Sequence, residues 1–388
     1  MFKIPFNVLY YSITIIIFLV KGYSFIKEFK LDSRKGIKEY AKKNKIDVLI
    51  SIGDEDEALN FYPLIASLER KKILHLISVE DKRGHNIIQR KIIDSSKTLL
   101  KKESFLPDYI ITLICYRPKI IIISSKNISL IFLFIAKILK IKIYIWQNNK
   151  NQYRNKIINY FSDITYNSQE NHYCKNYIGN IKILNAKPYS LMSKCNELNC
   201  LLVVSHNKNN INNFLDLFNK IKKARSEQKG IFLIPLESKY EIITIFKLNS
   251  TKYYIWDNEP VDLGTIFIDY DIIIGFEKTT LKYFSKKADL CILDLKKNKD
   301  WSYVLAEVAI NKTCILNYNC LNSNFQKQWI VEINTLEKLY EKILNLYNNK
   351  IEMKTLQTLA YDDINDFQKE IQLKLDNMVL DIKKNIIK

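Results

Sequence analysis

The sequence from Lys45 to Leu68 reads KIDVLISIGDEDEALNFYPLIASL, and this stretch predicts a β-strand, a tight turn and an α-helix in succession. An apolar run from Ile46 to Ile52 ends at Gly53, and four acidic residues follow at positions 54–57. Beyond them, apolar residues recur at the spacing of one helix face. In open α/β sheets, ligands bind at the carboxyl ends of strands, where such turns lie. The stretch therefore predicts an α/β domain with carboxylates at its ligand-binding edge.

The acidic cluster allows two interpretations. Acidic residues favour the first turn of any helix, because the unpaired N–H groups there carry partial positive charge. On that interpretation positions 54–57 only stabilise the helix. On the other, Asp54 and Glu55 are catalytic carboxylates at a strand end. The sequence by itself leaves both open.

The alternation of short apolar runs with amphipathic segments continues through the first half of the chain. The predicted strands are Ile46–Ser51, Ile73–Val79, Lys119–Ser124, Lys142–Trp146, Ile164–Tyr166 and Ile181–Leu184. The predicted helices are Ala58–Glu69, Asn86–Ser95, Ser129–Leu139, Lys156–Phe161 and Glu170–Tyr177. Strands that alternate with helices predict a parallel sheet with helices on both faces.

The segment from Lys187 to Asn199, KPYSLMSKCNELN, lacks periodicity, and the alternation restarts after it. The second set of predicted strands is Cys200–Ser205, Ile231–Pro235, Tyr253–Trp256, Thr265–Ile268, Leu290–Leu293 and Cys314–Asn317. The second set of predicted helices is Ile211–Ala224, Lys239–Lys247, Thr279–Lys286, Tyr303–Ile310, Leu336–Tyr347 and a helical tail from Met353. We therefore predict two Rossmann-like, doubly wound domains, over residues 36–190 and 191–350, that face a central cleft. Residues 1–35 and 351–388 are predicted as a membrane anchor with its basic segment and a helical tail.

The composition of the chain limits the classes of ligand and site that are expected. The formal charge of +19 favours anionic partners, such as phosphorylated substrates or an anionic membrane surface, although biased lysine usage contributes to it. Nucleic acid is not expected, because the aromatic residues lie mostly inside apolar runs. The 7 cysteines form no CxxC pair and the four histidines are scattered, so neither a disulfide framework nor a zinc site is predicted. We expect a reducing compartment and no metal or cofactor.

The N-terminal segment predicts a membrane anchor. From Ile4 to Val20 no residue is charged, and basic residues follow at positions 21, 27, 30, 34, 35, 38, 42 and 43. Positive charge stays on the cytoplasmic side of a membrane, so the bulk of the chain is expected there. The alternative is a buried first helix of the globular fold.

Nucleotide-binding and hydrolase signatures are absent: the sequence contains no GxxxxGK[ST], GxGxxG, GxSxG or HExxH. The order of segments nevertheless resembles the 3-deoxy-D-manno-octulosonic acid (Kdo) transferases of lipid A biosynthesis, a family of GT-B glycosyltransferases. The resemblance runs from the N-terminus to about Phe325. Its residues are Ser51-Ile52-Gly53-Asp54, Pro63-Leu64-Ile65, Arg117-Pro118-Lys119, Lys140 to Trp146, Ser168-Gln169-Glu170, Lys187, Pro235, Ala288-Asp289-Leu290 and Glu307.

The sequence also departs from that family. Asp54 stands where the family has its catalytic glutamate, with Glu55 beside it, and Ser125–Leu130 replaces a segment with two acids. Leu236 replaces an arginine after Pro235. A longer serine-histidine-glutamate segment is reduced to Ser205-His206-Asn207-Lys208, and Tyr303 stands near the place of a histidine.

The resemblance implies transfer of Kdo from CMP-Kdo to lipid IVA at the cytoplasmic face of the inner membrane. Asp54 or Glu55 would be the base, and Lys187, Ser205, Pro235 and Glu307 would bind the donor. Lys187 and Glu307 are equally compatible with a solvated surface lysine and an ordinary helix-face acid. Two alternatives remain: a GT-B enzyme with a different nucleotide-sugar donor, or a noncatalytic descendant that binds lipid A precursors.

Overall fold

The structure is a computed structural model. It describes residues 46–91, 98–100, 113, 116–124, 130–147, 161–167, 176–187, 200–205, 207–235, 239–248, 252–256, 263–276, 281–295, 302–318 and 327–387. The predicted anchor at residues 4–20 and the predicted domain boundary at residues 190 and 191 lie outside this description. Within it, no helix combines the length and the apolar character needed to cross a bilayer.

The first sheet has six strands in the order β3-β2-β1-β4-β5-β6, and all its pairings are parallel. Its strands are β1 (Val48–Ile52), β2 (His75–Val79), β3 (Thr98–Leu100), β4 (Ile120–Ser124), β5 (Lys142–Gln147) and β6 (Ile164–Asn167). The connecting helices are α3 (Glu55–Arg70), α4 (Lys82–Lys91) and α6 (Leu130–Ile138). The order reverses between β1 and β4, and that position is where doubly wound sheets bind ligands.

The second sheet has seven strands in the order β13-β12-β11-β7-β8-β10-β9, again with parallel pairings. Its strands are β7 (Cys200–Ser205), β8 (Lys229–Leu233), β9 (Tyr253–Ile255), β10 (Ile272–Gly275), β11 (Leu290–Asp294), β12 (Cys314–Tyr318) and β13 (Ile330–Ile333). Its helices are η4 (Lys208–Asn210), α8 (Ile211–Ala224), α9 (Lys239–Leu248), α10 (Leu263–Asp269), α11 (Leu281–Lys287), α12 (Ser302–Ala309) and α13 (Leu336–Asn348). The order reverses between β7 and β11.

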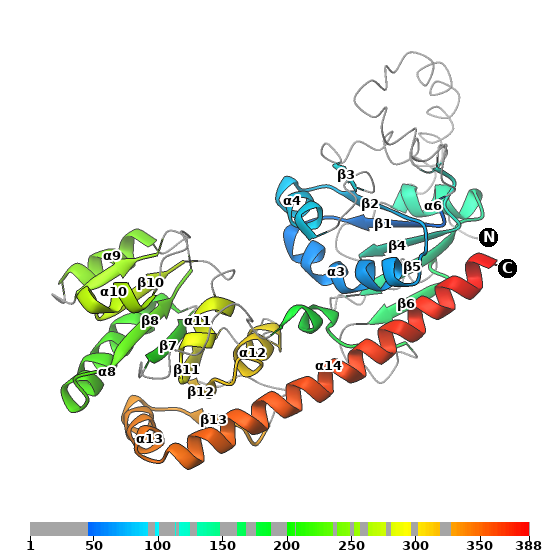
Figure 1. Cartoon of the computed structure of the whole chain (residues 1–388). Helices are drawn as coiled ribbons and strands as arrows, with labels where there is room; N and C mark the ends of the chain where they lie inside the picture. Colours follow the sequence, from blue (N-terminus) through cyan, green and yellow to red (C-terminus); the bar gives the residue numbers. More distant parts are fainter. Residues whose placement is uncertain are drawn as a thin grey trace, which may run out of the picture.

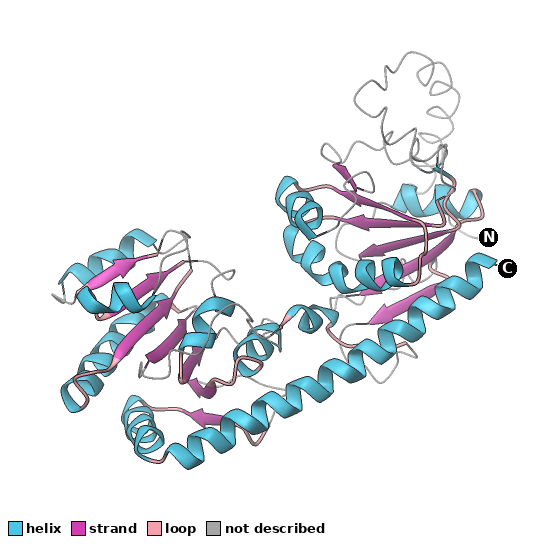
Figure 2. Ribbon diagram, in the orientation of Figure 1, coloured by secondary structure: helices cyan, strands magenta, loops and turns pink. Residues whose placement is uncertain are grey.

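Continuous apolar runs form the central strands because both faces of each sheet are covered (Figure 2). In β1, Val48 and Ile50 enter one core, whereas Leu49 enters a separate core beneath α6. In Figure 1 the carboxyl ends of β1 and β4 point toward the side of the second domain. Those of β8 and β10 point toward the first domain.

Two predicted strands are helical. Residues 181–184 lie in a 3-10 helix, η3 (Ile181–Asn185), and residues 265–268 lie in α10. Ile181 and Ile183 are both buried, which imitates the period of a strand. However, Gln368 supplies the hydrogen-bond donor that a neighbouring strand would supply, because its side-chain nitrogen lies 2.8 Å from the Ile183 carbonyl oxygen. In α10, Ile266 and Phe267 are buried whereas Ile268 and Asp269 are exposed, a pattern that fits the one buried face of a helix.

Three strands were not predicted: β3, β10 and β13. The strand β10 is formed by a second apolar run, which follows α10 after Asp269 and Asp271, so the prediction assigned the strand to the wrong one of two adjacent runs. The predicted helices at residues 156–161 and 170–177 fall largely outside the described residues.

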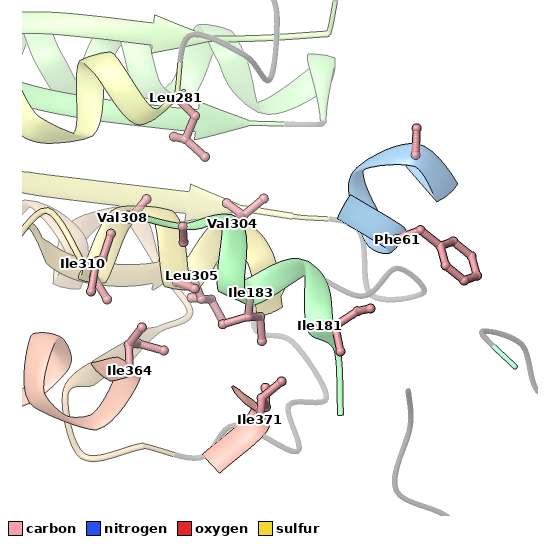
Figure 3. Close-up of a cluster of buried hydrophobic side chains, with 14 of the residues drawn as sticks. Phe61, Ile181, Ile183, Leu281, Val304, Leu305, Val308, Ile310, Ile364 and Ile371 are labelled. Carbon is pink, nitrogen blue, oxygen red and sulfur yellow. The ribbon is translucent and has the colours of Figure 1, made fainter. Parts of the chain in front are cut away.

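The two domains are joined by η3 and by the 38-residue helix α14 (Lys350–Ile387). Figure 3 shows Ile181 and Ile183 of η3 among Phe61 of α3, Leu305 of α12 and Ile371 of α14. At its far end α14 reaches the first sheet, where Asn385 donates to the Tyr144 hydroxyl oxygen over 2.9 Å. The C-terminal helix therefore belongs to the packing of both domains (Figure 1).

Candidate active site at the carboxyl edges of the two sheets

The turn between β1 and α3 holds the predicted catalytic acids. Asp54 is the N-cap of α3, and its Oδ1 accepts a hydrogen bond from the Glu57 amide over 2.8 Å. Glu55 is the first residue of the helix, and both acids are half-buried. The helix therefore begins as capping chemistry predicts, and it also presents two carboxylates at the end of β1. The capping interpretation of the acidic cluster is confirmed, and the catalytic interpretation stays a prediction.

Glu57 is the acid that links this turn to the neighbouring strand. Its side chain is 1% exposed. One carboxylate oxygen accepts a hydrogen bond from the Gly53 amide over 2.7 Å, and the other accepts one from the hydroxyl of Ser124. Ser124 is the last residue of β4, so Glu57 joins the two strands that flank the switch point of the first sheet.

The next turn along the sheet packs against the first. The Asp81 amide donates to the Gly53 carbonyl oxygen over 3.0 Å, and the Gly84 amide donates to Asp81 Oδ2 over 2.9 Å. A Cβ at Gly84 would lie 3.1 Å from the Asp54 carbonyl oxygen, so glycine permits this close approach. Nearby His85 is half-buried, and that burial lowers the pKa of its imidazole. The turns after β1 and β2 thus carry several acids, among them Asp54, Glu55 and Asp81, and a histidine with a lowered pKa.

In the second sheet, a polar cluster occupies the corresponding switch point. Ser205 ends β7 and Asp294 ends β11, and the Ser205 hydroxyl donates to Asp294 Oδ2 over 2.8 Å. Asn210, just before α8, donates to the same oxygen over 3.0 Å. Burial raises the pKa of the Asp294 carboxyl, and the hydrogen bonds from Asn210 and Ser205 offset part of the rise. Each sheet therefore has a buried carboxylate hydrogen-bonded to a serine at its order reversal.

Two other predicted donor residues lie at loop positions. Pro235 is half-buried and follows β8, whose partner β7 ends at Ser205, so both residues lie at the same edge of the second sheet. Lys187 is exposed and directly follows the junction segment that contains η3. Its exposed side chain is compatible with an anionic ligand at the junction.

Glu307 has a different environment from the one expected of a donor-binding residue. It lies on α12 with 1% exposure. Burial, followed by the negative charge of nearby Glu307, raises the pKa of the Tyr303 hydroxyl. The ammonium of Lys182 in η3 lies 5.1 Å from the centroid of the Tyr303 ring. Tyr303 is thus close both to the buried Glu307 and to the junction segment η3.

Sequence reasoning missed Glu57 and Asp294 as individual site residues. A signal existed for Glu57, because Asp54 and Glu57 have the spacing of a capping box. Asp294 had a weaker signal: an acid at the end of a fully apolar strand. Its link to Asn210 arises from tertiary structure and has no local signal.

The arrangement is suited to proton transfer and to binding of a polar ligand. Half-buried carboxylates at the end of β1 can accept a proton from a hydroxyl group placed within hydrogen-bond reach. Across the described residues, no group of three or more histidine, cysteine, aspartate or glutamate side chains has a metal-binding arrangement.

Comparisons with known proteins establish the fold. No protein-family model matches the chain, and no curated protein matches it. Among solved structures, it is similar to a glycosyltransferase from Rickettsia africae, with a TM-score of 0.59, 12% identity, and coverage of 88% of this chain and 100% of that one. Anabaena HepE in complex with UDP has a TM-score of 0.58, 9% identity, and coverage of 87% and 99%. UDP-GlcNAc 2-epimerase from Neisseria meningitidis bound to UDP-GlcNAc has a TM-score of 0.55, 11% identity, and coverage of 81% and 96%. At these identities the shared property is the two-domain architecture, and the chain has the GT-B fold.

Proposed function

We propose that this protein is a glycosyltransferase that uses a nucleotide sugar, and that it transfers Kdo from CMP-Kdo to lipid IVA. The observation that carries the proposal is the pair of half-buried acids, Asp54 and Glu55, held at the carboxyl end of β1 beside the switch point. The GT-B architecture supports the general reaction. The sequence resemblance to Kdo transferases supports the particular donor and acceptor.

The chemistry assigns one role to the acids. An acceptor hydroxyl oxygen attacks the anomeric carbon of the sugar, and Asp54 or Glu55 takes the hydroxyl proton. The bond between the anomeric carbon and the phosphate oxygen of CMP breaks, and CMP leaves with the electron pair. Asp54 is fixed by its cap to the Glu57 amide, so the turn is ordered before substrate arrives.

The proposed donor-binding residues belong mainly to the second sheet. Ser205, held by Asp294, and Pro235 lie at one edge of that sheet, and we propose that Lys187, exposed just after η3, meets the phosphate or the sugar carboxylate. Cations bind such groups by charge and hydrogen bonding. The nucleotide is expected against the ends of β7 and β11.

A different donor is the second candidate, and Glu307 favours it. This acid is only 1% exposed, so it does not present its carboxylate to a donor hydroxyl as the Kdo transferase resemblance implies. Two similar structures contain UDP or a UDP-sugar, which makes a uridine nucleotide the first alternative donor to test. A noncatalytic protein that binds lipid A precursors is the remaining possibility.

The proposal also covers location. The uncharged residues 4–20 and the basic residues that follow support an anchor at the cytoplasmic face of the inner membrane. An anchor there would hold the enzyme on the membrane that contains the lipid acceptor.

The decisive experiment is a transfer assay with membranes that contain the full chain, CMP-Kdo and lipid IVA, with Asp54→Asn and Glu55→Gln as variants. Asparagine also caps helices, so Asp54→Asn removes the base and keeps the turn. Loss of product in either variant, by about a hundredfold or more, identifies the base. Glu341→Gln, on the exposed side of α13, is the matched control and should retain full activity.

The same preparation separates the alternatives. No product from a folded wild-type protein, together with binding of UDP but not CMP in calorimetry, would replace Kdo with a uridine-linked sugar. Binding of lipid IVA without binding of any nucleotide would identify a noncatalytic protein.

A further inference from the structure

The amino edge of the first sheet, opposite the candidate active site, carries basic residues in an unusual backbone conformation. Lys72, Arg117 and Lys140 have positive φ angles of 55°, 40° and 57°. Each is exposed, and each comes shortly before the start of a strand: β2, β4 and β5 respectively. Glycine is usual at such helix ends, because a side chain costs about 1–2 kcal/mol in the left-handed conformation. Three residues with long, positively charged side chains thus occupy positions where the backbone conformation favours glycine.

These three residues lie along one continuous edge. The Asp47 amide donates to the Leu74 carbonyl oxygen, the Lys119 amide donates to the Asp47 carbonyl oxygen, and the Lys142 amide donates to the Lys119 carbonyl oxygen, each over about 3 Å. These hydrogen bonds join the starts of four neighbouring strands, and the three basic residues precede positions 74, 119 and 142 by two residues each. Adjacent strands are roughly 5 Å apart, so the three charges are confined to a short span.

Acids on this edge are already paired with other lysines. Asp47 lies 3.7 Å from the Lys119 ammonium, and Asp163 lies 2.8 Å from that of Lys137. The edge therefore keeps an excess of positive charge.

Exposed apolar side chains accompany these cations. Phe134 and Ile138 are 43% and 58% exposed on the outer side of α6, one helical turn apart. Leu139 and Leu74 are each 38% exposed at the same edge, and Leu74 precedes Leu76, which packs in the core beneath α6. The outer side of a helix in a water-soluble domain is normally polar. We call these four apolar and three basic side chains the α6 edge.

The first 45 residues of the sequence connect to the domain at this same edge. Ile46 is the first described residue, it directly precedes Asp47, and 45 residues come before it. Residues 4–20 contain no charge, and residues 21–45 contain nine basic and three acidic residues. An uncharged segment and a strongly basic segment of the sequence therefore precede the α6 edge directly.

We infer that the α6 edge is a contact surface for an anionic lipid bilayer. The cations match the headgroup charge, and Phe134, Ile138, Leu139 and Leu74 have the character of side chains that enter the interface. The amino edge of the first sheet is opposite its carboxyl edge, so the proposed contact does not use the candidate active-site residues. This inference concerns a surface and does not depend on which sugar the protein transfers.

The test is lysine footprinting of the full chain, with an acetylating reagent and mass spectrometry. The protein is compared in neutral detergent, on phosphatidylcholine vesicles, and on vesicles with one third phosphatidylglycerol. Lys72 and Lys140 should lose reactivity at least fivefold on the anionic vesicles alone. Lys220 and Lys247, exposed on α8 and α9, are internal controls and should react equally in all three.

A set of variants tests the same surface without destabilising the fold. Lys72→Gly, Arg117→Gly and Lys140→Gly together remove three charges and relieve the positive φ angles, so the triple variant should be at least as stable as the wild type. Its partition onto anionic vesicles should fall about a hundredfold, since each basic residue near such a surface contributes about fivefold. The matched control combines Lys312→Gly, a lysine with φ 58° before β12 of the other sheet, with Lys220→Gln and Lys247→Gln. It should partition as the wild type does.

Two results would overturn the inference. Unchanged reactivity of Lys72 and Lys140 on anionic vesicles would mean that the edge faces water while another segment holds the protein. Protection of these lysines already in detergent would mean that the edge is covered by the protein's own chain or, where it depends on protein concentration, by a second copy.

Discussion

Ser124, at the end of β4, donates its hydroxyl hydrogen to the buried carboxylate of Glu57, on the first turn of α3. The other oxygen of the same carboxylate accepts the Gly53 amide. A single acid therefore fixes the turn that carries Asp54 and Glu55 relative to the neighbouring strand. Glu57 is a positioning residue, since it acts on the proposed base through the backbone of the turn.

Glu57→Ala should lower the free energy of unfolding by about 2–4 kcal/mol, because the Gly53 amide and the Ser124 hydroxyl both lose a buried acceptor. Glu55→Ala, two residues away and half-buried, should cost less than about 1 kcal/mol. Urea unfolding of both variants measures the difference. Equal losses would show that the Glu57 carboxylate does not hold the turn.

Asp294→Asn should change how stability depends on pH. Burial raises the pKa of Asp294 in the folded protein, so the folded state binds more protons than the unfolded state between the ordinary aspartate pKa and the raised one. The contribution of Asp294 to stability therefore falls as pH rises through that window. Asparagine keeps an oxygen for Ser205 and Asn210 and removes the charge.

Thermal unfolding between pH 4 and pH 7 checks this prediction. In the variant, the part of the fall in stability with rising pH that Asp294 contributes should be absent. The variant should therefore be as stable as the wild type at pH 7, or more stable. Should it be less stable at pH 7, the charged form of Asp294 is favoured by the fold. Sugar transfer by the variant should nonetheless decrease, if Asp294 orients Ser205 toward the donor.

The sequence was sufficient for the architecture because apolar runs such as Ile120 to Ile123 form strands wherever helices cover both faces. It was misleading where tertiary partners decide the backbone. Ile181 and Ile183 alternate like a strand, but Gln368 of α14, far along the chain, supplies the hydrogen bond that holds η3. The candidate site divides in the same way. Asp54 and Glu55 were predicted from a local pattern, whereas Asp294 acquires its partners only when β7, β11 and the segment before α8 meet.

Gly230 provides a test of packing in the second domain. A Cβ at this position of β8 would lie 2.8 Å from Phe218 Cε2, and Phe218 is fully buried against Phe232. Gly230→Ala should therefore cost about 1–3 kcal/mol, as overpacking of a dense core does. The double variant with Phe218→Leu should recover part of that loss in urea unfolding. No recovery would indicate that Phe218 is not the obstacle.

Gln368 tests whether α14 couples the two domains. Its side-chain nitrogen donates to the carbonyl oxygens of Ile183, over 2.8 Å, and Ala186, over 2.7 Å, so it attaches the C-terminal helix to the junction. Gln357, about three helical turns earlier, donates to the Asp289 carbonyl oxygen over 3.0 Å, inside the second domain. Each alanine substitution should cost about 1–2 kcal/mol through the lost hydrogen bonds.

Only Gln368→Ala should also separate the unfolding of the two domains, because it weakens the contact between them. Calorimetry should show one transition for the wild type and for Gln357→Ala, and a broadened or double transition for Gln368→Ala. A single sharp transition in all three proteins would place the coupling in the apolar contacts around Ile183 and Ile371 instead.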